Sequence, residues 1–253
     1  MSFVLVRFLK ALLRLLFVFI AGGERCAVCG KTTWYYPLCR ECRKDYFSIK
    51  DSCLADRCKK CGKELISTND LCLQCRENTV LVHTDSVWPL FSYRLWNKDL
   101  MFLWKSAGIR SLSDLFADFV AEALKIKGVE IVVPVPPRPG KIQEKGWDQI
   151  DELCGQLRYR FGFTVLPLLE RKTAGQQKKL DREERLKTIG KSYFLVGKKE
   201  VEKLLKPFDG NFPAKVCIID DVCTTGSTLE NCALVLKEAG IKVVDAITLF
   251  AVD

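Results

Sequence analysis

The chain has 253 residues, a length typical of one or two domains. Hydrophobic residues make up 48% and charged residues 28%, an ordinary globular composition that excludes a chain too polar to form a core. The formal net charge is +9, and residues 138–206 hold 17 basic and 10 acidic side chains, a net +7. This excess favours a polyanionic ligand or nucleic acid there, with a solvated basic face as the alternative.

Residues 1–23 predict an amphipathic helix. Arg7, Lys10 and Arg14 are spaced i, i+3 and i+7, which makes one face of an otherwise apolar helix basic. The uncharged stretch after Arg14 is too short to span a bilayer, and no small-residue cleavage site follows as in a signal peptide. We expect no transmembrane segment and a helix that packs on the protein's own core. Contact with a membrane surface and true insertion stay open as alternatives.

Residues 24–78 predict a double zinc-ribbon module. They contain eight cysteines in four CxxC pairs, and each pair can place two sulfurs on one metal ion. Sequential pairing gives two sites of four cysteines each, and a cross-braced exchange of pairs stays open. With no histidine nearby the metal is expected to be structural zinc, and an iron–sulfur cluster is the chemical alternative. The cysteines are Cys26, Cys29, Cys39 and Cys42 for site one, and Cys58, Cys61, Cys72 and Cys75 for site two.

The two halves of this module repeat one another, because Gly30 and Gly62 each follow the second cysteine of a pair directly. Each CxxC pair is expected to form a tight turn, called a knuckle, around the metal. Glycine tolerates the positive φ that such a knuckle often requires. The module is either a stapled lobe without a ligand or a surface for nucleic acid or a protein partner. Aromatic residues with basic neighbours, such as Trp34 to Tyr36, favour the second hypothesis. Free thiolate ligands also indicate a reducing compartment.

Residues 85–253 predict an α/β domain in which helices alternate with apolar strands. Strand, helix and strand in succession indicate parallel crossovers and a doubly wound sheet, and ligands of such sheets bind past the carboxyl ends of the strands. The expected helices cover residues 112–123, 147–161 and 227–239, and the expected strands cover 131–135, 216–220 and 243–249.

One peptide of this domain, residues 216–228, predicts a sugar-phosphate site. Four apolar residues precede Asp220 and Asp221, and the turn from Thr224 to Thr228 then leads into a helix. Backbone N–H groups at a helix N-terminus, with hydroxyls and a glycine, suit a phosphate, and adjacent carboxylates suit ribose hydroxyls. An acidic strand end without a ligand is the structural alternative. A P-loop nucleotide site is excluded because no GxxxxGK[ST] motif precedes the strand.

This peptide resembles the signature of type I phosphoribosyltransferases, which bind 5-phosphoribosyl-1-pyrophosphate (PRPP). Together with the preceding zinc knuckles, the chain is similar to the ComF (competence protein F) family of double zinc ribbon phosphoribosyltransferase-like proteins. The resemblance extends to Leu103-Trp104-Lys105 before Gly108, to Pro134-Val135-Pro136, to residues 145–149 and to Gln177, Leu180 and Arg185. The chain departs from the family's usual residues at Lys145, Trp147, Asp148 and Thr188.

The resemblance implies roles for individual residues. Asp220 and Asp221 would bind the ribose hydroxyls, and the turn would hold the 5′-phosphate, while Mg²⁺ would accompany the pyrophosphate. Arg138 and Lys105 would lie near the pyrophosphate. The basic segment from Arg171 to Lys187 would close over the site as a mobile loop. The turn residues are Thr224, Thr225, Gly226, Ser227 and Thr228.

The resemblance also implies a cytoplasmic protein that handles incoming single-stranded DNA during natural transformation. Its partners would be a helicase-like DNA-import factor and a DNA-protecting loader. The alternative is an active phosphoribosyltransferase of nucleotide metabolism or salvage with no role on DNA. Whether PRPP is turned over stays open: no general base stands out, since the single histidine, His83, lies between the two modules.

Overall fold

The computed structural model describes residues 12, 13, 16–34, 36–47, 57–65, 69–93, 96–172 and 192–252. The chain divides into two compact units. Unit 1 comprises Met1–Ser48 and Arg94–Leu115, and unit 2 comprises Ile49–Tyr93 and Phe116–Asp253. The first cysteine tetrad therefore belongs to unit 1, while the second shares unit 2 with the sheet.

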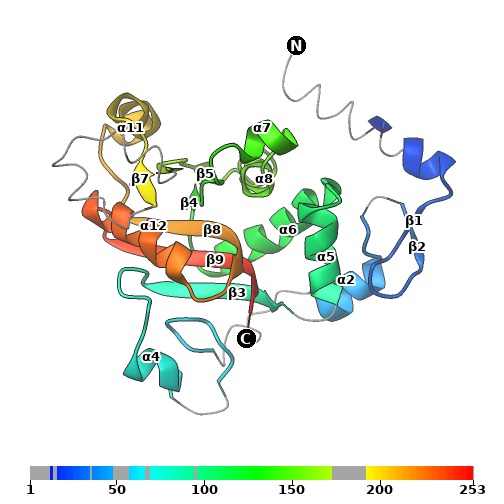
Figure 1. The fold of residues 1–253 in the computed structure, drawn as a ribbon, viewed down its shortest axis with the longest axis horizontal. Helices are drawn as coiled ribbons and strands as arrows, with labels where there is room; N and C mark the ends of the chain where they lie inside the picture. Colours follow the sequence, from blue (N-terminus) through cyan, green and yellow to red (C-terminus); the bar gives the residue numbers. More distant parts are fainter. Residues whose placement is uncertain are drawn as a thin grey trace. The chain divides into compact units, whose positions relative to one another are not determined.

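A five-stranded parallel sheet forms the centre of unit 2 (Figure 1). Its order is β3-β9-β8-β4-β5, and all four pairings are parallel. The strands are β3 (Ser86–Ser92), β4 (Ile131–Pro134), β5 (Thr164–Val165), β8 (Lys215–Cys223) and β9 (Val243–Ala251). The predicted fold class, an α/β phosphoribosyltransferase-like parallel sheet with two cysteine groups in the N-terminal region, is confirmed.

Helices pack on both faces of this sheet. Helix α12 (Ser227–Glu238) buries Leu229 and Leu236 in a cluster with Ile218 of β8 and Ala246 of β9. Helix α8 (Gln149–Phe161) contacts β4, β5 and β8. Successive residues of a strand point to opposite faces. In β8, Asp221 therefore contacts α8, while Asp220 faces α12.

Helix α6 (Ser111–Ile126) passes from unit 1 into unit 2. Its predicted apolar stripe is confirmed, since every member is buried. Within unit 2, the Phe116 and Phe119 rings pack edge-on against Phe250 of β9 and Phe91 of β3, with centroids 5.9 and 5.3 Å apart. The stripe consists of Leu112, Leu115, Phe116, Phe119, Val120 and Ala123.

Several strands differ from the sequence expectation, and two of them are informative. Strand β8 continues beyond the expected end at Asp220 to Cys223, because β9 pairs with it along that length. Strand β3 was not predicted, since Pro89 lies in its middle. Proline lacks the N–H that a central strand would need, and β3 accommodates it because it is an edge strand.

The remaining elements of unit 2 lie at the periphery of the sheet. The antiparallel hairpin of β6 (Leu169–Arg171) and β7 (Tyr193–Leu195) packs beside α12. The predicted mobile loop falls between these strands and, beyond Lys172, lies outside the described residues. The others are the short helices α4 (Leu73–Glu77) and α7 (Lys141–Lys145), helix α11 (Lys198–Leu205) and the 3-10 turn η1 (Lys206–Phe208).

Unit 1 is built from short elements. Residues 16–20 are helical, with Val18 buried and the other four side chains exposed. The three basic residues of the predicted N-terminal helix lie outside the described part. Among the described residues, no helix has the length and apolar character needed to cross a membrane. The elements are β1 (Glu24–Arg25), β2 (Thr32–Thr33), α2 (Arg40–Tyr46) and α5 (Trp96–Lys105).

Candidate functional site

The eight cysteines of the CxxC pairs form two tetrads, and the pairing is sequential. In each tetrad the four sulfurs all lie within 4.8 Å of one another. The Sγ atoms of Cys29 and Cys39 are 3.7 Å apart, and those of Cys61 and Cys72 are also 3.7 Å apart. Four sulfurs about 2.3 Å from a tetrahedral zinc ion would stand about 3.8 Å apart, so the donor sets fit zinc.

One thiol in each tetrad, Cys26 or Cys58, has a lowered pKa and ionises more easily than an ordinary cysteine. Burial opposes ionisation of Cys26, but backbone N–H groups of Cys29, Cys39 and Val28 donate to its sulfur and lower its pKa to about 6. Backbone donors likewise outweigh burial at Cys58 and lower its pKa to about 7. Metal binding requires thiolates, so these N–H donors favour the ligating form.

The backbone of the two knuckles repeats almost atom for atom. The Gly30 N–H donates to Cys26 O at 2.9 Å, and the Gly62 N–H donates to Cys58 O at 2.8 Å. Both glycines have a φ of +71°, which confirms the expectation that the knuckle requires a left-handed residue here.

The second tetrad is packed against the sheet of unit 2. The Val87 N–H at the sheet edge donates to Lys60 O at 2.8 Å, and the Arg57 guanidinium donates to Pro89 O at 2.5 Å. Gly62 lies so close to β3 that an added Cβ would stand 2.4 Å from both Pro89 Cδ and Val87 O. Cys61 packs against the same apolar cluster that supports β8 and α12. The lobe that carries the second tetrad is thus an extension of the sheet edge.

The predicted sugar-phosphate peptide forms a strand, a turn and a helix N-terminus. The turn residues Thr224, Thr225 and Ser227 lie at the surface, and Thr225 Oγ1 lies 2.8 Å from Ser227 Oγ. Gly226, with a φ of +81°, directly precedes α12. The turn therefore presents hydroxyls and helix N–H groups at the end of β8.

Leu81 supports this turn from beneath. An added Cβ on Gly226 would lie 2.8 Å from Leu81 Cδ2, so the turn approaches the chain that leaves the second tetrad very closely. Leu81 is buried and belongs to the same cluster as α12. A side chain at position 226 would meet both a left-handed φ and this contact, which explains the glycine.

Glu230, in the first turn of α12, anchors the segment that connects the second tetrad to β3, which contains Leu81, His83 and Thr84. Its carboxylate accepts from the backbone N–H groups of His83 at 2.7 Å and Thr84 at 3.1 Å, and it also bonds His83 Nδ1 at 2.6 Å. Burial would raise the pKa of Glu230, but these donors outweigh it and lower the pKa below its ordinary value. The single histidine, His83, therefore helps to hold the Glu230 carboxylate against this segment.

The two acids receive different support. Asp220 Oδ1 accepts from the backbone N–H of Asp221 at 2.8 Å. Asp221, which is 9% exposed, accepts at Oδ2 from the side-chain amide of Gln149 at 2.8 Å. Sequence reasoning placed Gln149 in a family-like segment but missed this contact, since 72 residues separate the partners.

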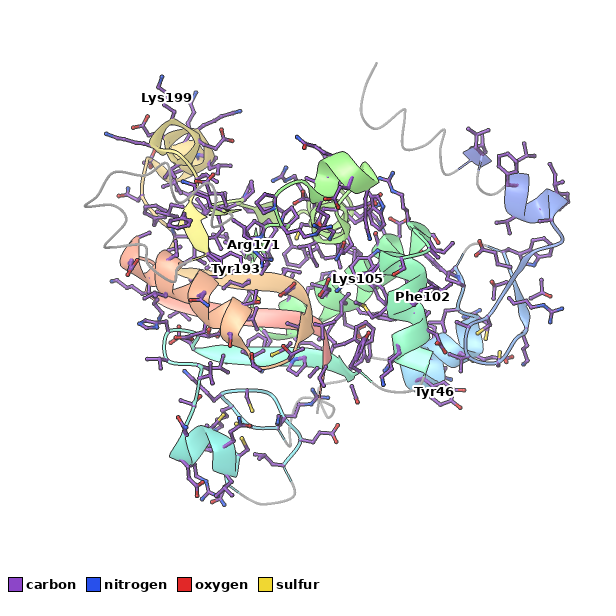
Figure 2. All side chains as sticks on the ribbon, in the orientation of Figure 1. Tyr46, Phe102, Lys105, Arg171, Tyr193 and Lys199 are labelled. Carbon is purple, nitrogen blue, oxygen red and sulfur yellow. The ribbon has the colours of Figure 1, made fainter. Side chains whose placement is uncertain are left out.

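A second missed residue lies at the other end of the motif. The Tyr193 hydroxyl lies near the Thr228 side chain, and burial raises the pKa of Tyr193. The Arg171 guanidinium lies over the Tyr193 ring, 5.4 Å from its centroid, and both residues are labelled in Figure 2. The β6–β7 hairpin thus brings an aromatic hydroxyl to the turn.

The two residues expected near the pyrophosphate lie in different units. Arg138 is in the loop that follows β4, the strand beside β8, and it pairs with Glu144 at 2.5 Å. Lys105 is the last residue of α5 in unit 1. Only Arg138 therefore shares a compact unit with the strand–turn–helix.

No protein-family model matches the chain. The chain is similar to a protein named competence protein ComFC, from Streptococcus pneumoniae (strain ATCC BAA-255 / R6). The two are 30% identical over 178 residues, which is 70% of this chain and 71% of that protein. Together with the parallel sheet and the paired cysteine tetrads, this likeness shows that the chain belongs to the ComF family.

Proposed function

We propose that this chain binds PRPP at the segment from Asp220 to Thr228. The observation that carries the proposal is the exposed turn around Gly226, which offers hydroxyls and helix N–H groups at the carboxyl end of a central parallel strand. Thr224, Thr225, Gly226, Ser227 and Thr228 would hold the 5′-phosphate. Leu81 lies so close to that turn that an added Cβ at position 226 would clash with it.

Asp220 and Asp221 would accept from the ribose hydroxyls beside this turn. Mg²⁺ would arrive with the pyrophosphate, which supplies the oxygen ligands that this ion prefers. Arg138 would meet the pyrophosphate, because the loop that carries it follows the strand next to β8. Lys105 remains a candidate for the same group on the family resemblance alone.

The two tetrads would hold structural zinc ions. Each supplies four thiolates, which fill a tetrahedral site and leave no position open for chemistry. The metal would stabilise its lobe without taking part in any reaction. Zinc content after extensive dialysis, two equivalents per chain, is the expected measurement.

The cellular role that fits best is competence-related: handling of incoming single-stranded DNA in the cytoplasm during natural transformation. The name of the pneumococcal relative supports this role, as does the basic stretch of residues 138–206. In that stretch Lys198, Lys199 and Lys203 are exposed on α11, and Figure 2 shows Lys199 pointing outward. A helicase-like import factor and a DNA-protecting loader would be its partners.

Calorimetric titration of PRPP with Mg²⁺ into zinc-loaded protein tests the ligand. We expect saturable binding in the unchanged protein and none in an Asp220→Asn/Asp221→Asn variant that retains its zinc and its circular dichroism spectrum. Absence of binding in the unchanged protein would overturn the sugar-phosphate proposal.

Titration of a labelled single-stranded oligonucleotide tests the DNA role. Binding should be tolerant of sequence and should weaken steeply with salt, because lysine–phosphate contacts release counterions. Replacing Lys198, Lys199 and Lys203 together by glutamine should weaken it further. No binding even at low salt would leave the competence role without a DNA contact.

A second candidate function is transfer of the phosphoribosyl group. Both acids and the complete turn favour it, since these groups would position PRPP for transfer. The bond from C1 to the pyrophosphate oxygen would break as an acceptor nucleophile bonds to C1, and charge stabilisation would supply most of the catalysis. Release of pyrophosphate on addition of acceptor bases, above an Asp221→Ala control, would demonstrate it.

A further inference from the structure

Three polar side chains from the starts of α7 and α8 form a hydrogen-bonded chain that ends at Asp221. Gln149 donates through Nε2 to Asp221 Oδ2 at 2.8 Å, and Lys141 Nζ donates to Gln149 Oε1. Lys141 Nζ also donates to Asp148 Oδ2 at 2.6 Å. All four groups are largely buried, and the Asp148 side chain is only 2% exposed.

Lys141 decides which end of the Gln149 amide faces the strand. An ammonium group can only donate, so it takes the amide oxygen, and the amide nitrogen is left to point at Asp221. The flipped amide would set its oxygen against the carboxylate and its nitrogen against the ammonium, and both contacts would be repulsive. The bond to Asp221 is therefore directional.

The residue that holds Lys141 is part of the same helix start. Asp148 caps α8 by accepting from the N–H groups of Ile150 at 2.9 Å and Asp151 at 3.1 Å. Its other oxygen holds Lys141. The N-terminus of α8, the ammonium and the amide thus form one connected network, and networks in which each donor meets an acceptor are rigid.

We propose that Gln149, oriented by Lys141, is a positioning residue that sets the direction of the Asp221 carboxylate for a ribose hydroxyl. This inference rests on the proposed binding of PRPP at the same strand end. Strand geometry directs the side chains of Asp220 and Asp221 to opposite faces, so different donors reach the two carboxylates. The Asp221 backbone N–H supports Asp220, and α8 supports Asp221.

Four variants test this role by calorimetry with Mg²⁺ and PRPP. Gln149→Leu should weaken binding by about tenfold or more, since it removes a hydrogen bond to a charged group. Gln149→Glu keeps the size and shape but replaces the donor, so it should be at least as weak. Lys141→Met should lose about threefold or more. Gln156→Leu, later in the same helix, is the matched control and should stay within about twofold.

A double-mutant cycle separates positioning from general damage. In an Asp221→Asn background, Gln149→Leu should cost less than about threefold, because the group that it positions has already lost its charge. An equal loss in both backgrounds, or full binding by Gln149→Leu alone, would overturn the proposal.

A measurement without ligand keeps the inference separate from the proposed function. In ¹⁵N-labelled protein, the Gln149 side-chain amide signals, assigned by their loss in Gln149→Leu, should move on Asp221→Asn and much less on Asp220→Asn. If the unchanged protein does not bind PRPP, the proposed function fails, and these signals alone decide whether Gln149 holds Asp221. Signals that ignore Asp221→Asn would overturn the inference.

Discussion

The two cysteine tetrads share one local design, but their surroundings differ. Both have the same knuckle hydrogen bonds, the same left-handed glycine and the same sulfur spacing. The first belongs to unit 1, where its Cys29 is exposed. The second is bonded to the edge strand β3 and leads through Leu81 to the turn before α12. The comparison indicates that the surroundings of a tetrad, not its cysteines, connect the second tetrad to the sheet edge and to the turn before α12.

The strongest test of the difference between the two tetrads is to disrupt one tetrad at a time. Cys58→Ser should lower the free energy of unfolding of unit 2 by at least about 3 kcal/mol, a fraction of the roughly 10–16 kcal/mol that structural zinc contributes in zinc-finger peptides. Hydrogen exchange in residues 215–232 should accelerate, because the lobe supports β8 and α12. Mass spectrometry of exchanged peptides measures this effect.

Cys26→Ser is the matched control in the first tetrad. It should also lose one equivalent of zinc but leave exchange in residues 215–232 unchanged. If both substitutions accelerated hydrogen exchange in residues 215–232 equally, the two lobes would stabilise the strand–turn–helix to the same extent.

A pair of glycine substitutions sharpens the same contrast. Gly30→Ala and Gly62→Ala both force alanine into a φ of +71°, which costs about 1–3 kcal/mol each. Only the Gly62 Cβ would also clash with β3, whereas nothing lies within 4 Å of the Gly30 Cβ. Gly62→Ala should therefore cost a further ~1–3 kcal/mol in denaturant titrations. Equal costs would mean that the second lobe can move away from the sheet.

Two equally buried leucines test the link to the turn. Leu38 in the first lobe and Leu81 in the second are each 5% exposed, so Leu→Ala at either should cost about 2–4 kcal/mol. Leu81→Ala should in addition weaken PRPP binding, because it removes the support beneath Gly226. Leu38→Ala should bind PRPP like the unchanged protein. If a folded Leu81→Ala variant bound PRPP as well as the unchanged protein, Leu81 would have no role in PRPP binding.

The smallest effect is expected at the carboxylate that anchors the connecting segment. Glu230→Gln should cost about 1–2 kcal/mol at pH 7, since it weakens several hydrogen bonds to a charged group. The folded pKa of Glu230 lies below 4.5, so its contribution is present above that pH and is lost as the pH falls through the folded pKa.

Thermal unfolding from pH 7 to pH 3 measures this dependence. The difference between Glu230→Gln and the unchanged protein should shrink below about pH 4.5. Glu41→Gln, which removes an exposed carboxylate from the first lobe, should leave the melting temperature unchanged. A constant difference for Glu230→Gln at every pH would mean that its charge is irrelevant.

Patterns of short range were readable in the sequence because they depend on neighbours along the chain. The CxxC spacing predicted both tetrads, and the apolar stripe from Leu112 to Ala123 predicted α6. The glycine at position 226 and the acids before it predicted the strand–turn–helix that the structure shows. The strand β3 escaped prediction because Pro89 is acceptable only at a sheet edge, and edge position is a property of the assembled sheet.

The sequence by itself indicated the eight cysteines that form the two tetrads, the order of the main strands and helices, and the peptide proposed to hold a sugar phosphate. These follow from side-chain chemistry and from hydrophobic periodicity within a few residues. Tertiary structure alone decided that the second tetrad supports the turn, that Gln149 holds Asp221 and that Tyr193 reaches Thr228. Such contacts join residues that are distant along the chain, and only the packing of strands and helices brings their side chains within bonding distance.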